Sequence, residues 1–309
     1  MTALEIKRRL APDDIAEVRE LLGAAERADG HRPLSDHLWL DLVEGGRAGF
    51  AGLIAWEHGH PHPVGYAQLS RGNESWALEV VVHPHHRYDM QQIGPDLLRA
   101  ALGEVAGQGG GHVHWWVFEP SAAHQALAAS VGLHPGRTLY QMRRPLPLET
   151  SGSLPTRPFV VGRDEQAWLT VNNRAFADHP EQGNWTLDTV RAREKEPWFD
   201  PDGFRLHELD GRLAGFCWTK VHLDTSPVLG EIYVIATDPD YHGRGLGRQL
   251  TVAGLDHLAR RGVPVGMLYV DADNAAATGL YRSLGFTVHR TDGAFVGDIR
   301  PGTAGGTAG

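Results

Sequence analysis

Apolar positions along this chain follow helical and strand-like spacings, and the same order of spacings occurs twice. In each half a stretch with helical spacing comes first, over Asp13–Ala28 and over Glu165–Ala177. Two apolar runs then predict a β-hairpin in each half: Phe50–Trp56 with Val64–Leu69, and Phe204–Leu209 with Leu213–Val221. The mixture predicts an α/β chain of two domains, a number that 309 residues also favour.

The strand-to-helix segment that follows each hairpin repeats as well. Val80–Pro84 matches Ile235–Pro239, and 155 residues separate the two prolines. Gly94 opens an apolar helix as Gly247 does, but only 153 residues separate these glycines. The first copy therefore carries two extra residues between the end of its strand and its helix.

A segment rich in proline, serine and glycine, residues 147–158, lies between the two copies. Such a composition predicts an extended linker. We therefore expect an N-terminal domain over 1–146 and a C-terminal domain over 159–298. The remaining residues, 299–309, are too polar and glycine-rich to pack, and we expect them to be disordered.

The most informative segment is the apolar strand Glu231–Pro239 with the glycine-rich turn that follows, His242-Gly243-Arg244-Gly245-Leu246-Gly247-Arg248. A helix predicted over Gln249–Arg261 comes next. Backbone N–H groups of such a turn can converge on an anion at a helix N-terminus, so we expect a phosphate-bearing ligand there. A P-loop would need Lys-Ser or Lys-Thr after the glycines, and a dinucleotide-binding loop would need G-x-G-x-x-G; neither is present. The turn resembles a third type, the R/Q-x-x-G-x-G/A pyrophosphate loop of GNAT acetyltransferases.

A second signature supports this resemblance. After a predicted strand over Gly266–Asp271, the residues Asn274–Phe286 match the GNAT pattern N-x-x-A-x-x-x-Y-x-x-x-G-F. The two signatures have the order and separation of that family. The resemblance implies two tandem GNAT-like domains, each a mixed, splayed β-sheet flanked by helices, and acetyl-CoA as cosubstrate.

Acetyl transfer to an amine needs a base, an oxyanion donor and a proton donor for the departing thiolate. The resemblance implies that Glu231 accepts the amine proton and that Tyr281 hydrogen-bonds to the sulfur and protonates it. It further implies that acetyl-CoA contacts a set of residues on the strands, loop and helices that follow Glu231. These are Ile235, Ala236, Thr237, His242, Gly243, Arg244, Gly245, Leu246, Gly247, Arg248, Tyr269, Asn274, Ala276 and Ala277.

The first copy lacks the residues that the resemblance assigns to catalysis and phosphate binding in the second copy. The equivalents of Glu231, Gly245 and Tyr281 fall at Trp76, Gln92 and Ala128. A side chain at the position of Gly245 strains a backbone that needs positive φ and blocks close approach to phosphate. We therefore expect the N-terminal domain to be non-catalytic. The family also binds acetyl-CoA in this domain, which implies a possible second site at Val80, Val81, Val82 and Gly94.

Longer stretches resemble one GNAT family in particular, the mycothiol synthases: Gln141–Leu146, Val171–Trp185, Trp198–Gly203 and Gly215–His222. This resemblance implies acetylation of the cysteinyl α-amine of cysteine–glucosamine–inositol, the last step of mycothiol biosynthesis. It implies substrate contacts at Asp36, Glu181, Lys220 and Glu231. The alternatives are a GNAT enzyme for another small-molecule or peptide amine, and a non-catalytic acyl-CoA sensor.

Composition excludes several other partners. A formal net charge of −9 disfavours nucleic acid, and no apolar run is long enough to span a membrane. One cysteine, Cys217, fits a reducing cytoplasm, where we expect a monomer. We expect no metal, because glycine and prolines between His58, His60 and His62 indicate a hairpin loop.

Overall fold

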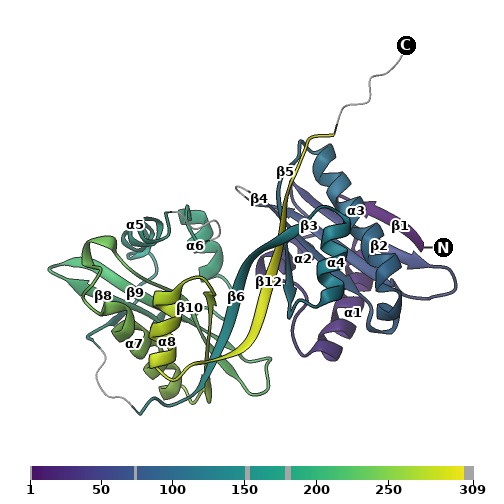
Figure 1. Ribbon diagram of the computed structural model, residues 1–309. Coiled ribbons are helices and arrows are strands. Elements are labelled where there is room, and N and C mark those ends of the chain that lie inside the picture. The colour runs from purple at the N-terminus through teal and green to yellow at the C-terminus, as the bar shows by residue number, and fades with distance from the viewer. Residues whose placement is uncertain (1, 73–74, 150–153, 178–181, 303–309) are drawn as a thin grey trace. The chain divides into compact units, whose positions relative to one another are not determined.

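The computed structural model describes residues 2–72, 75–149, 154–177 and 182–302 (Figure 1). The chain forms two compact units: unit 1 is Met1–Thr138 with Asp292–Gly309, and unit 2 is Leu139–Thr291. Each has a mixed sheet flanked by helices, so the predicted α/β class is confirmed. Within the described ranges no helix has the length and apolar character needed to cross a membrane.

Among the described strands of unit 1, β4 and β5 form a parallel pair, and the other neighbouring pairs are antiparallel. Helices α1 and α2 pack on one face and α3 and α4 on the other. The strands, in order across the sheet, are β1 (Thr2–Lys7), β2 (Phe50–Glu57), β3 (Gly65–Arg71), β4 (Ser75–Val82), β5 (Gly111–Phe118) and the later part of β12 (Thr287–Ile299). The helices are α1 (Pro12–Asp29), α2 (Asp36–Val43), the 3-10 helix η1 (Pro84–Asp89), α3 (Met90–Gly107) and α4 (Ala122–Ser130).

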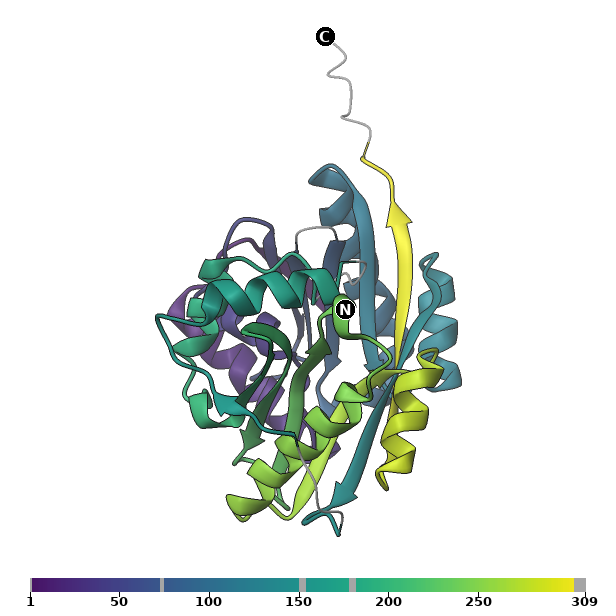
Figure 2. The ribbon, with the colours of Figure 1, turned by 90° about the vertical axis from the view of Figure 1, so that its left-hand side faces the viewer.

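Unit 2 has the same plan, with β10 and β11 as its parallel pair. Figure 2 looks onto this unit and shows α5 and α7 on opposite sides of its strands. Its strands, in order, are β7 (Arg157–Pro158), β8 (Phe204–Leu209), β9 (Arg212–His222), β10 (Leu229–Thr237), β11 (Val265–Asp271) and the later part of β6 (His134–Pro145). Its helices are α5 (Glu165–Ala175), α6 (Leu187–Glu194), η2 (Pro201–Gly203), η3 (Pro239–Tyr241), α7 (Leu246–Arg260) and α8 (Ala275–Ser283).

Each unit includes one strand that the other repeat supplies. Residues 139–145 of β6 pair antiparallel with β11, and residues 292–299 of β12 pair antiparallel with β5. The units are therefore divided inside β6 and inside β12, and not within the segment 147–158. Residue 299 still belongs to β12, while residues 303–309 of the expected disordered tail lie outside the described part of the chain.

The hairpin turn expected in the second repeat is confirmed. Asp210 and Gly211 join β8 to β9 with φ angles of 51° and 75°. Two successive residues with positive φ are typical of the type I′ turn, whose twist matches that of the strands it connects. Aspartate followed by glycine is a preferred sequence for this turn, which is why the sequence located it.

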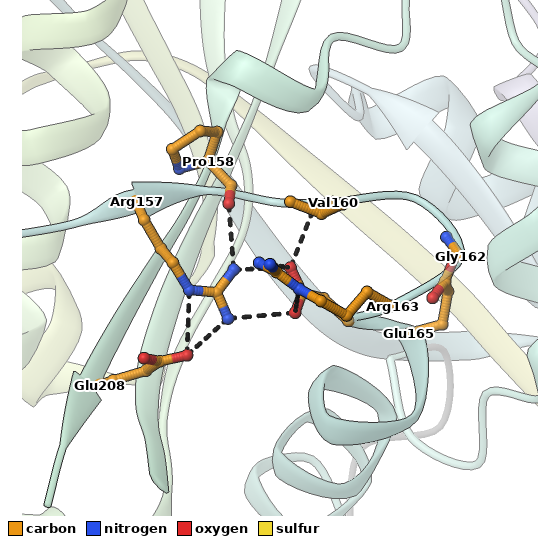
Figure 3. Close-up of polar contacts among 8 residues, drawn as sticks. Arg157, Pro158, Val160, Gly162, Arg163, Glu165 and Glu208 are labelled. Carbon is orange, nitrogen blue, oxygen red and sulfur yellow. Dashed lines mark hydrogen bonds and ion pairs between the residues drawn. The ribbon is translucent and has the colours of Figure 1, made fainter. Parts of the chain in front are cut away.

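The start of unit 2 is held by a cluster of charged side chains (Figure 3). The Arg157 guanidinium on β7 donates to Asp164 at 2.6 Å, at the start of α5, and to Glu208 on β8 at 3.0 Å. The backbone N–H of Val160 also donates to Asp164, at 2.8 Å. Burial raises the pKa of this carboxyl, but the hydrogen bonds from Arg157, Arg163 and Val160 outweigh it and lower the pKa to about 2. The cluster thereby joins β7, α5 and β8.

Candidate active site

The parallel strands at the centre of unit 2 separate along their length. Leu229–Ile232 of β10 pair with Val265–Leu268 of β11, and the pairing ends there. Beyond that point β10 continues on β9 as far as Thr237, while β11 continues on β6 as far as Asp271. Successive N–H groups of a strand point to alternate sides. Some backbone donors of residues 233–237 therefore face the opening between the strands, as the expected splay requires.

A β-bulge lies at the beginning of this opening. Ile232 is opposite Thr219 and Val234 is opposite Trp218, so that Tyr233 is an extra residue in β10. Bulges bend a strand and redirect its side chains, and they are common next to active sites. Here the bulge coincides with the point at which β10 leaves β11.

The bulge also corrects the alignment of the two repeats. In unit 1 the pairing of β4 with β3 has no such shift, and Ala77 lies opposite Ser70 as Glu231 lies opposite Lys220. The counterpart of Glu231 is therefore Ala77, and the expected counterpart, Trp76, was wrong by one residue. Alanine has no carboxylate either, so the first repeat still lacks this group.

Glu231 is a nearly buried carboxylate with a defined partner. Its side chain is 10% exposed, and its Oε2 lies 2.8 Å from Nε2 of His222. A carboxylate can only accept, so the ring nitrogen donates this bond. Lys220 lies directly opposite Glu231, and alternate residues of β9 share a face, so that His222, Lys220 and Trp218 point to the same side of the sheet. The sequence did not mark His222 as a site residue, and its place two residues after Lys220 was the available signal.

Aromatic rings surround the Lys220 ammonium. Its Nζ is 4.7 Å from the ring centre of Trp198 and 5.7 Å from that of Tyr233, within the range of cation–π attraction. The two rings meet edge to face at 5.1 Å, and Trp218 approaches Tyr233 at 5.3 Å. Lys220 is only 6% exposed. The Lys220 ammonium and the three aromatic rings therefore form one surface beside the Glu231 carboxylate.

The other two predicted substrate residues cannot be placed in this way. Glu181 lies outside the described residues, which resume at 182. The backbone of Asp36 begins α2 in unit 1, but its side chain is not among those described. The structure therefore brings together Lys220 and Glu231 of the four.

Tyr281 approaches the opening from the other face of the sheet. Its ring, in α8, packs on Phe286 at 5.9 Å in the hydrophobic cluster that includes Leu250 of α7. The side chain is 8% exposed, and burial raises the pKa of its hydroxyl to about 12. The phenol therefore keeps its proton at neutral pH. Glu231 and Tyr281 therefore lie on opposite faces of the sheet, close in sequence order to the strands β10 and β11 that separate.

The glycine-rich turn has the backbone geometry of an anion site. Gly243 and Gly245 have φ angles of 77° and 74°, a left-handed conformation that favours glycine. Gly245 is the N-cap of α7, and no side chain caps the helix. Residues 242–245 are exposed, so the N–H groups of the first helical turn can reach a ligand. The helix begins at Leu246, three residues before the predicted start at Gln249.

Three of the expected acetyl-CoA residues also have structural partners. The Tyr269 hydroxyl accepts hydrogen bonds from Gln141 at 2.8 Å and from Arg290 at 3.3 Å. Arg248 donates to the Ser283 hydroxyl at 2.8 Å. Asn274 caps α8 by accepting the N–H of Ala277 at 3.0 Å, and Ala276 lies in the first turn of that helix. Arg248 thereby joins α7 to α8, and Tyr269 joins β11 to β6 and β12.

The corresponding loop in unit 1 has a different course. Helix α3 begins at Met90, directly after η1, so that Gln92 and Gly94 both lie inside the helix. The counterpart of Gln92 in unit 2 is Gly245, which precedes its helix. The two extra residues thus extend η1 and α3, and Gln92 avoids the strain that we expected because its backbone is helical. Val80–Val82 end β4, and Ala128 is buried in α4.

Comparison with known proteins agrees with this geometry. The profile of the acetyltransferase (GNAT) family, whose members use acetyl-CoA, matches residues 168–286. The chain is 45% identical to the mycothiol acetyltransferase of Acidimicrobium ferrooxidans, over 92% of this chain and 93% of that one. It is 46% identical to the mycothiol acetyltransferase of Thermomonospora curvata, over 94% and 96% of the two chains. Among solved structures, a tandem GNAT protein from the clavulanic acid biosynthesis pathway superposes with a TM-score of 0.70 at 18% identity, over 97% and 100% of the two chains, which supports the fold.

Proposed function

Because this chain belongs to the mycothiol acetyltransferase family of GNAT enzymes, we propose that it acetylates the cysteinyl α-amine of cysteine–glucosamine–inositol with acetyl-CoA. One observation carries the assignment of the site. A nearly buried carboxylate, Glu231, and a buried phenol, Tyr281, lie on opposite faces of the sheet at which β10 separates from β11. An acyl donor bound between the two strands would meet a proton acceptor on one side and a hydrogen-bond donor on the other.

The turn before α7 is the proposed site for the pyrophosphate of acetyl-CoA. The left-handed Gly243 and Gly245 aim backbone N–H groups outward, and the uncapped N-terminus of α7 adds the positive end of the helix dipole. His242 and Arg244 are exposed beside it, and the first helical turn contributes Leu246, Gly247 and Arg248. Backbone donors of Ile235–Thr237 that face the opening are suited to bind the thioester oxygen as charge develops on it.

Glu231 is the proposed acceptor of the amine proton. An α-amine has a pKa of about 8, so part of the substrate is already a neutral amine at neutral pH. The base deprotonates the molecules that still carry an ammonium group. The Oε2 of Glu231 is held by His222, which orients the carboxylate and leaves its other oxygen for the amine or a water molecule. The positive charge of Lys220, on the adjacent strand, disfavours a second ammonium nearby and so favours the neutral amine.

Tyr281 is proposed to stabilise the departing thiolate by donating a hydrogen bond. The pKa of its hydroxyl is about 12, whereas an ordinary thiol titrates at about 8.5, so complete proton transfer from this phenol would be uphill by about 5 kcal/mol. A hydrogen bond avoids that cost. The thiolate then takes its proton from the solvent-connected Glu231–His222 pair or from water, and Tyr281 need not be reprotonated in each cycle.

The choice of amine rests on the family. Asp36, Glu181 and Lys220, together with Glu231, are the proposed contacts to the sugar–inositol hydroxyls and the amine, for which carboxylates and an ammonium are suitable hydrogen-bonding partners. The N-terminal repeat is proposed to be non-catalytic, because Ala77 and Ala128 replace the base and the phenol and because α3 begins before Gln92.

The test is release of coenzyme A with three amines: cysteinyl-glucosaminyl-inositol, an aminoglycoside and a peptide. We expect turnover with the first only, and Glu231→Gln should lower its kcat/KM by about 10²–10⁴ while acetyl-CoA affinity stays the same. Asp298→Asn, which changes an exposed strand carboxylate, is the matched control. Turnover with another amine alone would favour the broader acetyltransferase, and tight acetyl-CoA binding with no turnover would favour the sensor.

A further inference from the structure

Histidines from two separate segments gather at one end of the unit 1 sheet. His60 and His62 lie in the loop between β2 and β3, while His83 and His86 follow the end of β4 and belong to η1 or the residue before it. The fold brings the segments together because β3 pairs with both β2 and β4. The backbone N–H of His83 donates to the Val64 carbonyl at 2.9 Å, which fixes one segment against the other.

Three of these side chains converge at the spacing of metal ligands. One nitrogen each of His60, His62 and His86 lies within 4.8 Å of the other two. The His60 and His86 rings meet at 4.5 Å, and His83 stacks on His62 at 4.4 Å. Ligand atoms around a tetrahedral zinc ion are about 3.3 Å apart, given bonds of about 2.0–2.1 Å. Small changes in side-chain torsions would bring the three nitrogens to that separation.

A carboxylate and a carbonyl complete the arrangement. The Oε2 of Glu57, at the end of β2, is 3.6 Å from Nδ1 of His86 and 3.6 Å from Nε2 of His60. The carboxylate therefore lies beside two of the three rings, although the mutual 4.8 Å spacing is met by the three histidines alone. The Nδ1 of His62 is 3.1 Å from the Pro63 carbonyl, which can only accept, so Nδ1 carries the hydrogen and Nε2 keeps its lone pair. Metal-binding histidines are commonly oriented by this kind of hydrogen bond to a backbone carbonyl.

We propose that His60, His62 and His86, with Glu57 in the fourth position, bind one divalent transition-metal ion of the zinc type. Imidazole nitrogens select zinc and its neighbours over magnesium and calcium, which prefer oxygen ligands. His86 is 2% exposed and anchors the site, while His60 is exposed and leaves the ion a path from solvent.

The proposed ion joins the β2–β3 loop to η1. Pro84 is the counterpart of Pro239 in the repeat, so η1 stands where unit 2 has η3 and the start of its phosphate loop. The ion would therefore fix the part of unit 1 whose sequence departs from the anion-binding turn. Because it binds the folded chain, it should raise the melting temperature, by an amount that grows with the logarithm of the zinc concentration relative to its dissociation constant.

The experiment uses the full chain after treatment with a chelator, titrated with ZnCl₂ in a calorimeter and followed by thermal melting. We expect one zinc ion per chain, no binding of Mg²⁺, and a melting temperature that rises with zinc. His60→Gln and His62→Gln should each weaken zinc binding by more than about 100-fold, since loss even of an outer partner costs about 10–100-fold. His60 is exposed, so we expect its replacement to leave the fold unchanged, and circular dichroism checks this.

The matched control is His58→Gln, in the same loop but outside the cluster. It should retain wild-type affinity, stoichiometry and zinc-dependent stabilisation. Absence of zinc binding by the wild-type chain would overturn the proposal. An equal loss of affinity in His58→Gln and His60→Gln would also overturn it, because zinc would then bind exposed histidines non-specifically and not the proposed cluster. Neither measurement involves acetyl transfer, so the outcome is independent of the proposed activity.

Discussion

Gly245 and Gly247 lie two residues apart at the start of α7, and the structure predicts opposite effects on stability when each becomes alanine. Gly245 has a φ of 74°, and an added Cβ would meet no atom within 4 Å. The cost of Gly245→Ala is therefore conformational, about 1–2 kcal/mol for an alanine in the left-handed region. Gly247 is inside the helix, and its Cβ would meet only Leu280, at 3.9 Å. Alanine stabilises such a position by about 0.5–1 kcal/mol.

Acetyl-CoA affinity should not follow stability. If the N–H groups of this turn bind the pyrophosphate, Gly245→Ala disturbs their direction, and Gly247→Ala places a methyl group beside the first helical turn. Both variants should bind acetyl-CoA more weakly in calorimetry, although Gly247→Ala melts higher than wild type. A change of 1 kcal/mol corresponds to about 2–4 °C for a unit of this size.

Gly103→Ala supplies the matched control. Gly103 lies in α3 of unit 1, and its added Cβ would meet nothing within 4 Å. We expect higher stability and unchanged acetyl-CoA affinity. Wild-type affinity in both Gly245→Ala and Gly247→Ala would refute the reasoning and place the phosphates elsewhere. Unchanged stability of Gly245→Ala would show that the turn does not depend on its left-handed conformation.

Three further predictions concern single polar groups. Tyr281→Phe removes one hydroxyl from a packed ring, and kcat should fall by about 10²-fold while the melting temperature stays within the error of a scan. Burial, and then the charge of Asp292, raise the pKa of Glu79 well above its usual range. The folded state thus favours the protonated form of Glu79. The stability that this carboxyl contributes is present below its unfolded pKa and is lost as the pH rises. Glu79→Gln should therefore raise the melting temperature more at pH 8 than at pH 4. The lowered pKa of Asp164 contributes about 2 kcal/mol to the free energy of unfolding above pH ~4, and this contribution is lost as the pH falls toward about 2. Asp164→Asn should therefore destabilise the folded chain at pH 7. Urea unfolding at a series of pH values should show a weaker loss of stability in acid for this variant.

Local signals in the sequence located several elements of both units. Both hairpins, the Asp210–Gly211 turn and the glycine-rich turn follow from residues within a few positions of each other, and the structure has all of them. Helix α7 begins earlier than predicted because glycines at 245 and 247 were both assigned to the turn. Only Gly245 is left-handed; Gly247 is helical, and sequence does not distinguish the two.

The non-local features were missed for one reason: the sequence of an apolar strand does not indicate with which strand it pairs. The exchange of β6 and β12 between the sheets leaves no trace in either strand's own pattern. The bulge at Tyr233 shifts the register by one and misplaced the counterpart of Glu231. His222 beside Glu231, and His86 beside His60, become visible only when strand pairing places one segment on another.

The exchange of strands fixes an order of completion during synthesis. Unit 2 is continuous in sequence and already contains its borrowed strand, residues 139–145, before β11 is made. Unit 1 leaves this edge of β5 unpaired until residues 292–299 have been synthesised. Domains usually fold in the order in which the ribosome produces them. In this chain unit 2 can therefore complete its sheet before unit 1, which needs residues 292–299 of β12.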